Sequence, residues 1–510
     1  MSVSILQMTG IAITLALIVG VSLYSGKKVS GGADFTTGGN GGGSLLVCGG
    51  IMGALVSSQA TIGTAQLAFS YGLSALWFTL GSGIGCLLLA LFFADPIRKS
   101  GCTTEFEIIR REYGKRVETI GSALCSIGIF ISVLAQVVAG AGLVSTLFPN
   151  LSTAAAVAII AVLMAVYVLF GGAIGAGMGG VLKLILLYVA SIAGLVTVLH
   201  LTGGLSGLEA ALQSVLVGTD LGNVQSAVFL SDINTTADLA SRFASLTARG
   251  ALKDIGSGLS LLLGVLSTQT YAQAILTGRT NREAKRGALL SACLIPPLGI
   301  AGIGIGLFMR TRYVTAAEAA ALAAAGKSIP EGMSTIASTI QVFPMFVAGR
   351  MPEFFGGIIL GTLLVTIIGG GAGLSLGVAT IAVRDIYTSI SPRFQNPKIA
   401  LRANRLTIIG VLALAAILGM AVPGATINDF GFLSMGLRGS VVFLPLVCAL
   451  FLPGKIDKRA VLVSTVLGPL AVLAGNAAGL PFDPLFLGIA VCLVIHALGY
   501  RRKGIALSAD

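Results

Sequence analysis

The sequence predicts an all-α polytopic membrane protein, and three features of its composition carry that prediction. Hydrophobic residues make up 55% of the 510 residues and charged residues only 10%, whereas soluble domains carry about 25% charged residues. The mean hydropathy is +0.96, and apolar stretches long enough to cross a bilayer recur along the whole chain. The 70 glycines suit closely packed membrane helices. We therefore expect residues 1–510 to form a single transmembrane domain.

Thirteen membrane spans are expected from the apolar stretches. Their approximate bounds are 5–24, 46–69, 73–95, 119–147, 152–170, 174–201, 252–276, 287–309, 352–387, 406–422, 431–452, 459–476 and 483–499. The first stretch lacks a basic leader, which predicts a retained span and not a cleaved signal. The two long loops, 202–250 and 310–350, contain Ala-rich runs, which are typical of short surface helices or of simple connectors.

The basic residues predict the orientation of the chain. Of the 32 Lys and Arg residues, 23 fall in loops or at span ends on one side of the thirteen spans and seven on the other, and only Lys183 and Arg438 lie well inside spans. Positive loops face the cytoplasm, so we expect the N-terminus outside and the C-terminus inside, in the plasma (inner) membrane. This topology explains the net charge of +12 without a nucleic-acid partner, and the bilayer is the expected surrounding.

Enzymatic chemistry is not expected. The seven cysteines are scattered without paired spacing, so they predict neither a metal site nor a disulfide framework. The sequence has no nucleophile–base arrangement and no phosphate-binding loop. We therefore expect no catalytic residue, no metal and no cofactor.

Two glycine-interrupted spans predict a binding site within the membrane. The stretch Gly49–Gly72 combines glycines with hydroxyl and amide side chains, and the stretch 252–276 repeats the pattern. Broken helices of this kind survive at bilayer depth only where they face protein or water, and in transporters they form the substrate site. The candidate solute ligands at the two breaks are Ser57, Ser58, Gln59, Thr61, Thr268, Gln269 and Thr270. We expect both breaks to be non-helical and to face each other.

Several weak motifs in the right order resemble the sodium–solute symporter family. They are SGKKVSGGADF after the first span, FSYGLSALW after the first broken helix, RKSGCTTEFEIIRREYGKR, YVLFGG, QTYAQAILTGRTNREAKRG and VRDIY. The resemblance covers roughly residues 5–460. It implies a LeuT-type core of five plus five helices in inverted repeat, 46–201 against 252–452, with one preceding span and two peripheral spans at 459–499. It also implies a secondary transporter that works by alternating access.

The sequence departs from the family where the family binds sodium. The resemblance places the carbonyl ligands at Gly53 and Val56, and the hydroxyl ligands at positions occupied here by Gly369 and Gly370. A family Asp is replaced by Gly180, and Lys183 follows one turn later on the same face. In some sodium-independent relatives of this fold, a Lys from this helix replaces the ion. We expect Lys183 to fill the sodium position, as a fixed charge or as a proton carrier, since burial favours the neutral amine. The alternative is that Lys183 extends to the cytoplasmic headgroups.

Two further polar residues lie deep in predicted spans. Arg438 either binds a solute carboxylate, or fastens loop carbonyls or pairs with Asp429. Gln136 is either a solute contact or an interhelical hydrogen bond. No carboxylate lies deep in a core span, so a cationic solute would lack a counter-charge. A small polar solute that is neutral or anionic is therefore expected.

Three functional hypotheses follow. The first is a sodium-independent secondary transporter, coupled to protons or to no ion. The second is a sodium symporter whose ion is held by other oxygens, such as that of Thr366. The third is a transporter-like sensor, which the eleven residues after the last span do not favour. A monomer or a weak homo-oligomer is expected, and the sequence does not identify the solute, the direction of transport or the roles of the two long loops.

Overall fold

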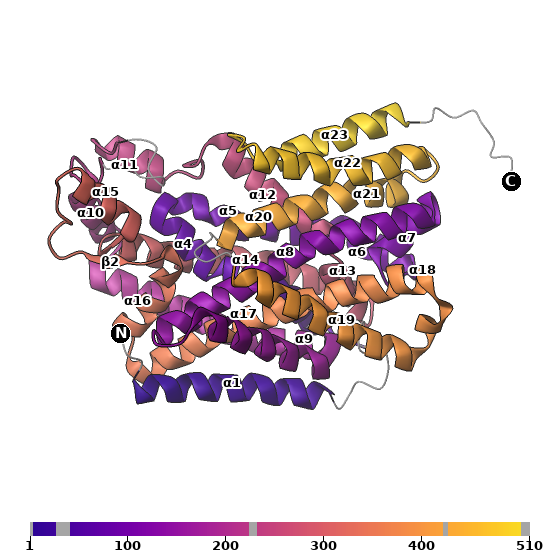
Figure 1. The fold of residues 1–510 in the computed structure, drawn as a ribbon, viewed down its shortest axis with the longest axis horizontal. Helices are drawn as coiled ribbons and strands as arrows, with labels where there is room; N and C mark the ends of the chain where they lie inside the picture. The colour runs from indigo at the N-terminus through magenta and orange to yellow at the C-terminus, as the bar shows by residue number, and fades with distance from the viewer. Residues whose placement is uncertain (1–3, 27–40, 224–231, 422–426, 501–510) are drawn as a thin grey trace.

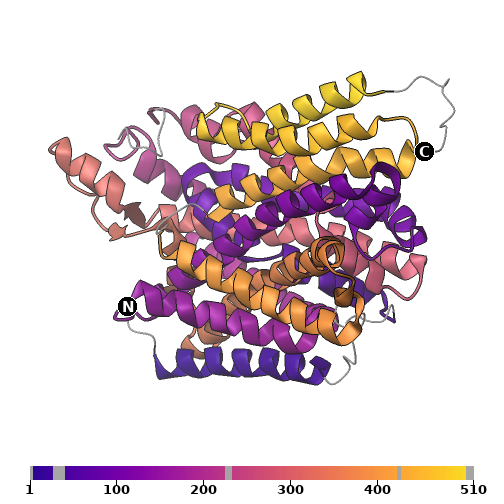
Figure 2. The same ribbon diagram turned by 45° about the vertical axis from the view of Figure 1, so that its right-hand side comes forward.

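The computed structural model describes residues 4–26, 41–223, 232–421 and 427–500. It is a bundle in which the long helices run alongside one another (Figures 1 and 2). Helix α1 lies along one edge, and α22 and α23 lie along the opposite edge. Most of the basic link after the first span, and the basic residues 501–503, fall outside the described residues. The first turn of α1 and the last turn of α23 lie at opposite ends of the bundle, which agrees with an odd number of crossings.

The first half of the chain consists of helices and helical turns. Their bounds are α1 Ile5–Gly26, α3 Ser44–Leu55, η2 Ser58–Ala60, α4 Ile62–Tyr71, η3 Gly72–Leu76, α5 Trp77–Leu88, η4 Leu89–Phe93, α6 Ala94–Lys99, α7 Glu105–Tyr113, α8 Lys115–Leu147, α9 Thr153–Thr202, α10 Leu205–Leu216 and α11 Thr236–Phe243.

The second half adds further helices and two short strands. Their bounds are α12 Ala251–Leu266, α13 Gln269–Thr277, α14 Asn281–Arg310, β1 Tyr313–Thr315, α15 Ala316–Ala324, β2 Ser334–Ile336, η5 Thr339–Gln341, α16 Val342–Arg350, α17 Glu353–Ile381, η6 Ala382–Tyr387, α18 Thr388–Ile390, η7 Pro392–Gln395, α19 Pro397–Gly419, α20 Ile427–Arg438, η8 Gly439–Phe443, α21 Leu444–Phe451, α22 Lys458–Ala477 and α23 Leu485–Leu498.

The chain is a multi-pass membrane protein, although its number of spans is not established. In the described part, eight helices are long and apolar enough to cross a membrane, or nine if the bent pair α12–α13 is one span, and four shorter apolar helices accompany them. Thirteen spans and the five-plus-five repeat therefore stay predictions. The predicted spans 152–170 and 174–201 both lie in α9. Met164, from the first half, approaches Gly371 of α17, and Lys183, from the second half, approaches Gly369, so the two halves lie against the same stretch of α17.

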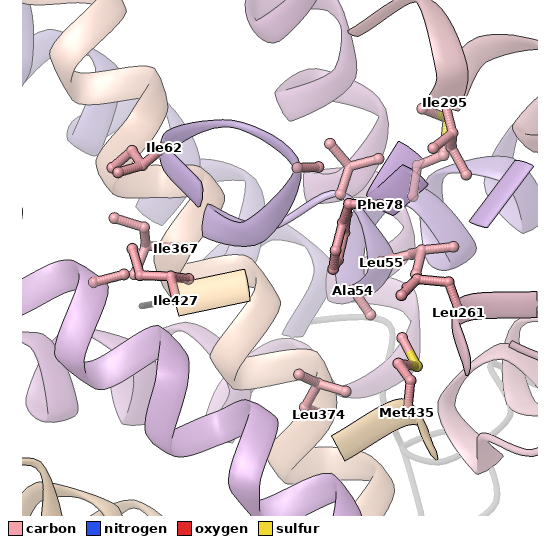
Figure 3. Packing of buried hydrophobic residues seen from close by; sticks show 14 of the residues in the cluster. Ala54, Leu55, Ile62, Phe78, Leu261, Ile295, Ile367, Leu374, Ile427 and Met435 are labelled. Carbon is pink, nitrogen blue, oxygen red and sulfur yellow. The ribbon is translucent and has the colours of Figure 1, made fainter. Parts of the chain in front are cut away.

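Both predicted breaks interrupt the α-helix. Helix α3 ends at Leu55, and extended backbone at Val56 and Ser57 precedes the single turn η2 before α4 begins. Helix α12 ends before Ser267, and α13 leaves at an angle of 48° to it. The helices α3 and α13 lie against each other, because a Cβ on Gly50 would stand only 3.0 Å from the Cβ of Ala274. The two broken helices are therefore neighbours. Figure 3 shows buried apolar residues around the first break, with Ala54 and Leu55 near Phe78 and Met435.

One end of the bundle is covered by short elements from the loops 202–250 and 310–350, for which the sequence left surface helices and simple connectors open. Helices α10, α11, α15 and α16 gather there, and α7 and α18 lie at the other end (Figure 1). The strands β1 and β2 pair in parallel, with Val314 opposite Thr335. This two-stranded sheet was not expected from the sequence and is the one departure from an all-α chain in the described residues.

Glycines bring α3 and α9 into close contact. A Cβ on Gly180 would overlap the carbonyl oxygen of Gly49, and a Cβ on Gly49 would overlap the carbonyl oxygen of Gly177. Small residues permit backbones to approach in this way in membranes. The contact leaves no room for the carboxylate that the family carries at position 180. It also places the next turn of α9, with Lys183, beside the end of α3.

The glycine contact predicts the effect of one added methyl group. Gly180→Ala should lower the stability of the folded protein by about 1–3 kcal/mol, because the overlapping atom belongs to the backbone and does not move easily. Gly410→Ala on α19 is the control, since nothing lies within 4 Å of its Cβ position, and it should leave stability unchanged or slightly raised. Thermal unfolding in detergent micelles measures both. Equal unfolding temperatures for the two variants would contradict this packing.

Candidate functional site

The Lys183 side chain lies on the carbonyls at the end of α3. It is 2% exposed, and its Nζ donates hydrogen bonds to the carbonyl oxygens of Gly53 at 2.7 Å and Val56 at 2.6 Å. The side chain therefore turns into the bundle and does not extend toward a membrane surface. These carbonyls are the two that the resemblance assigns to sodium.

The end of α3 suits a cation for electrostatic reasons. A helix leaves its last four carbonyls without helical partners, and its C-terminus carries a partial negative charge. At bilayer depth no lipid group can satisfy them. In the described part of the chain Lys183 forms no ion pair. Its positive charge is therefore balanced by carbonyl dipoles alone.

The glycines of α17 complete the surroundings of Lys183. A Cβ on Gly369 would lie 3.8 Å from the Lys183 Nζ, which is ordinary contact, whereas a Cβ on Gly370 would press on the Ser57 Cβ at 2.7 Å. The hydroxyl of Thr366, the alternative sodium ligand, donates to the carbonyl of Thr362 in its own helix. The use of this cluster for ion coupling stays a prediction.

Gln136 of α8 is hydrogen-bonded to the first break. Its Oε1 accepts from the Ser58 backbone at 3.1 Å and from the Ser58 hydroxyl at 2.7 Å, and its Nε2 donates to the Ser57 hydroxyl at 3.1 Å. The Thr61 hydroxyl donates to the Ser57 carbonyl at 3.1 Å. All four side chains are buried. In this conformation these groups satisfy one another and hold the unwound backbone, and their role as solute ligands stays a prediction.

Arg438 is hydrogen-bonded to the second break. Its side chain is fully buried, and its guanidinium donates to the Thr268 hydroxyl at 2.9 Å, to the Ser132 hydroxyl at 3.0 Å and to the Ser434 hydroxyl at 2.8 Å. The expected alternative partner Asp429 lies instead 4.0 Å from Arg249. Arg438 thus joins α8, α12 and α20 through neutral hydroxyls. Whether it also binds a solute is untested.

Gln269 and the loop before α7 form a contact that the sequence did not reveal. The Gln269 Nε2 donates to the Thr103 carbonyl at 3.0 Å, and its Oε1 accepts from the Glu105 backbone at 3.1 Å. The Thr104 hydroxyl donates to Asp385 at 2.7 Å. We call these contacts the α7 latch. Its members belong to three of the motifs that carried the resemblance, so the motifs were the available signal, although nothing in them identified the partners.

Thr270 lines a small cavity between the broken helices. The cavity has a volume of about 30 Å³ and lies between α3, α13 and α17, with Gly53, Thr270, Gln273 and Gly373 among its lining residues. A space of this size holds about one water molecule. Because Gly53 also accepts a hydrogen bond from Lys183, the cavity reaches the immediate surroundings of the ammonium.

Gln59 differs from its polar neighbours in having a side-chain nitrogen without a hydrogen-bond partner. Its Oε1 accepts from the Ser57 hydroxyl at 3.4 Å, but its Nε2 has no hydrogen-bond partner. Across the contact with α20, neither polar atom of the buried Asn428 has a partner. Sequence reasoning missed Asn428, because a single Asn at a span end is usually an ordinary helix-terminal residue.

Comparisons with known proteins agree with this fold. A curated relative, "Uncharacterized symporter YwcA" of Bacillus subtilis (strain 168), is 23% identical over 451 residues, which cover 87% of this chain and 80% of that protein. A Na+-coupled sialic acid symporter, solved in a substrate-bound outward-open state, gives a TM-score of 0.77 at 16% identity and covers 98% of this chain and 100% of its own. MHP1 is a nucleobase-cation-symport-1 family transporter, solved in a closed conformation with bromovinylhydantoin bound. It gives a TM-score of 0.50 at 11% identity, and the match covers 91% of this chain and 93% of MHP1.

The structural likenesses show the fold alone, since both identities are low. The family assignment comes from a family model, described as the sodium:solute symporter family, that matches residues 35–468. This range covers most of the chain, from the end of the basic link into α22. The members of this family and the structural neighbours are transporters and not enzymes. The protein therefore belongs to the sodium:solute symporter family, as its motifs predicted.

Proposed function

We propose that this protein is a secondary transporter that moves a small polar solute by alternating access without sodium at the family's usual site. One observation carries the proposal: the Lys183 ammonium donates to the carbonyls of Gly53 and Val56. Sodium would need the same oxygens. The solute is neutral or anionic, and its class is narrowed in the next subsection.

Electrostatic repulsion is the physical reason that sodium is excluded. Two unit charges 4 Å apart repel by about 4 kcal/mol at an effective dielectric constant of 20, which corresponds to roughly a thousandfold loss of affinity. Two hydroxyl ligands are also missing, because Gly369 and Gly370 have no side chains, and Gly180 has no room for a carboxylate. A sodium ion beside a charged Lys183 would therefore be bound weakly, if Lys183 stayed in place.

Proton coupling is the favoured use of Lys183. An ammonium held only by carbonyls, with no carboxylate partner, is costly in a dry interior. Access of water through the cavity beside Gly53 would let Lys183 release its proton toward that side. The neutral amine would then bind the end of α3 less strongly, which would free the broken helix to move. The family is sodium-coupled in general, so a sodium symporter with altered ligands is the outcome that the experiment below must exclude.

The α7 latch supplies a gate for this cycle. Gln269 stands at the first residue of α13, so its hydrogen bonds hold the moving half of the second broken helix against the loop at residues 103–105. Thr104 holds the end of α17 through Asp385. We propose that this end of the bundle faces the cytoplasm, because the loops around α7 and α18 carry eleven of the 32 basic residues. The N-terminus would then lie outside, in the plasma membrane.

The proposal predicts transport without sodium. Uptake into proteoliposomes, using a solute found by thermal-shift screening, should stay within about twofold when choline replaces sodium at constant ionic strength. Lys183→Gln should lower uptake at least about tenfold, because a neutral amide neither balances the end of α3 nor carries a proton. The variant should still fold, since Gln can donate to one of the two carbonyls.

The matched control is Lys398→Gln, which removes an exposed charge near the start of α19 and should transport like the wild type. Uptake that stops without sodium would contradict the proposal in favour of the sodium-coupled alternative. Wild-type uptake by Lys183→Gln would show that the ammonium only fastens α3.

The α7 latch predicts a dependence of stability on pH. Burial raises the pKa of Glu105 to about 8, Arg438 opposes this shift and Asp385 adds to it. The folded protein thus keeps this proton at pH values where the unfolded chain, with a pKa of about 4.5, has lost it. The folded state binds more protons between these values, so its stability should fall as the pH rises from 5 to 8.

Glu105→Gln tests this dependence, since its side chain stays neutral. Its unfolding temperature should change less between pH 5 and pH 8 than that of the wild type, whereas Glu353→Gln, at an exposed position, should keep the wild-type slope. A Glu105→Gln variant with the wild-type slope would show that the carboxyl of Glu105 is ionised in the folded protein.

A further inference from the structure

Two buried carboxamides face each other across the contact between the first broken helix and α20. Gln59 is 3% exposed and Asn428 is 0% exposed. The Gln59 Nε2 lies 2.8 Å from the Cβ position of Gly431, one turn beyond Asn428, and Asn428 overlaps the Cβ position of Gly63, one turn beyond Gln59. Each amide therefore points at a glycine of the other helix, and the two glycines leave the space that the amides occupy.

Three polar atoms of this pair have no hydrogen-bond partner: Gln59 Nε2, Asn428 Nδ2 and Asn428 Oδ1. Buried polar atoms are nearly always hydrogen-bonded, and an exception calls for an explanation. Nearby amides obey the rule. Gln136 uses both ends of its side chain on Ser57 and Ser58, and Gln66 uses both ends on Ile427 and Thr339. Among these four amides around the first break, the unused capacity is therefore found only in Gln59 and Asn428.

The surroundings of the pair are aromatic, and the charged groups beside them are paired with one another. The rings of Phe78 and Phe432 lie with centroids 6.0 Å apart, and Phe78 is 3.1 Å from the Cβ position of Gly431. Figure 3 shows Phe78 among apolar side chains, and Ile427, the residue before Asn428, beside Ile367. The nearest buried cation on α20, Arg438, is held by three hydroxyls, and Asp429 faces Arg249. Arg249 lies 5.1 Å from the centroid of the Phe432 ring, but its guanidinium is already paired with Asp254 at 2.7 Å. Among the described residues, a charged solute would therefore find no unpaired group of opposite charge at this pair.

We propose that Gln59 and Asn428 form the recognition element for a neutral, planar solute with adjacent donor and acceptor groups, such as an amide, a lactam or a ureide ring. A carboxamide presents one donor and one acceptor side by side, so it pairs with such an edge through two hydrogen bonds. Phe78 and Phe432 supply apolar faces for the plane of the solute. The inference rests on the proposed function, since it places the solute at the first break.

The hydrogen-bonding groups of Gln59 and Asn428 disfavour a solute that carries a carboxylate. A carboxylate could accept from the two amide nitrogens, but it would leave the Asn428 oxygen without a donor and its own charge without a cation. A neutral amide edge satisfies both kinds of atom. The proposal therefore narrows the solute from neutral or anionic to neutral.

The experiment compares matched neutral and acidic probes. Uracil and nicotinamide should raise the unfolding temperature of the purified protein, whereas orotate and nicotinate at the same concentrations should not. Asn428→Ala and Gln59→Ala should each weaken the apparent affinity for the neutral probe at least about tenfold, because a site that loses one polar partner leaves a solute atom unpaired. Asn404→Ala on α19, which removes a buried Asn far along the chain, should bind like the wild type.

A second measurement needs no solute. Asn428→Leu should raise the unfolding temperature of the protein without added probe, because it replaces an unpartnered amide with an apolar group of similar size. Gln66→Leu should lower it, because that amide has partners at both ends. A lower unfolding temperature for Asn428→Leu would show that Asn428 is structural and would overturn the proposal.

The remaining outcomes separate this inference from the proposed function. Stabilisation by the acids, or by none of the neutral probes, would overturn the solute class while leaving the Lys183 experiment unaffected. Stabilisation by neutral probes that requires sodium would overturn sodium independence and leave the recognition element standing. Stabilisation by neutral probes that Asn428→Ala does not weaken would place the solute elsewhere.

Discussion

A helix that stops inside a membrane must satisfy its last carbonyls without water, and this constraint shapes the whole centre of the protein. Helix α3 stops at Leu55, and the Lys183 ammonium meets two of its final carbonyls. The contact requires α9 to approach α3 at Gly49 and Gly180, which have no side chains to separate the backbones. The same approach removes the space for a carboxylate at position 180. The absence of a carboxylate at position 180 and the presence of an internal cation are thus two results of one packing arrangement.

At the second break, a carbonyl at the end of α12 is satisfied through a hydroxyl and not directly by a cation. Arg438 donates to the Thr268 hydroxyl, and that hydroxyl in turn donates to the Gly264 carbonyl. Each break in the membrane is therefore joined to a buried cation from another helix, directly at α3 and through a hydroxyl at α12. In the described part of the chain, neither Lys183 nor Arg438 forms an ion pair with a carboxylate. Their charge is instead spread over carbonyl and hydroxyl dipoles, which can be exchanged for water when a gate opens.

The sequence predicted the features that depend on local residue patterns, and it did not predict the contacts between residues that are far apart in the chain. Apolar length predicted the helices, and glycines beside hydroxyls predicted both breaks. The contact of Lys183 followed from the family resemblance, which placed the two carbonyls and the position of Lys183. The partners of Gln269 lie 166 and 164 residues away, and no local pattern specifies such pairs. The short strands β1 and β2 were missed because three residues carry almost no periodic signal. Asn428 was missed because its importance lies in the absence of partners, which only the packed chain reveals.

The small cavity between the broken helices lies next to residues that adjoin both the proposed gate and the ammonium. Its lining includes Thr270, on the half-helix that Gln269 begins, and Gly53, whose carbonyl accepts from Lys183. Release of Gln269 from the loop before α7 would let α13 move away from α3, and water would then enter at Gly53 first. Under the proposed cycle, opening of this gate and loss of the Lys183 proton are therefore parts of one event, since the same displacement exposes the carbonyl and the group that holds it.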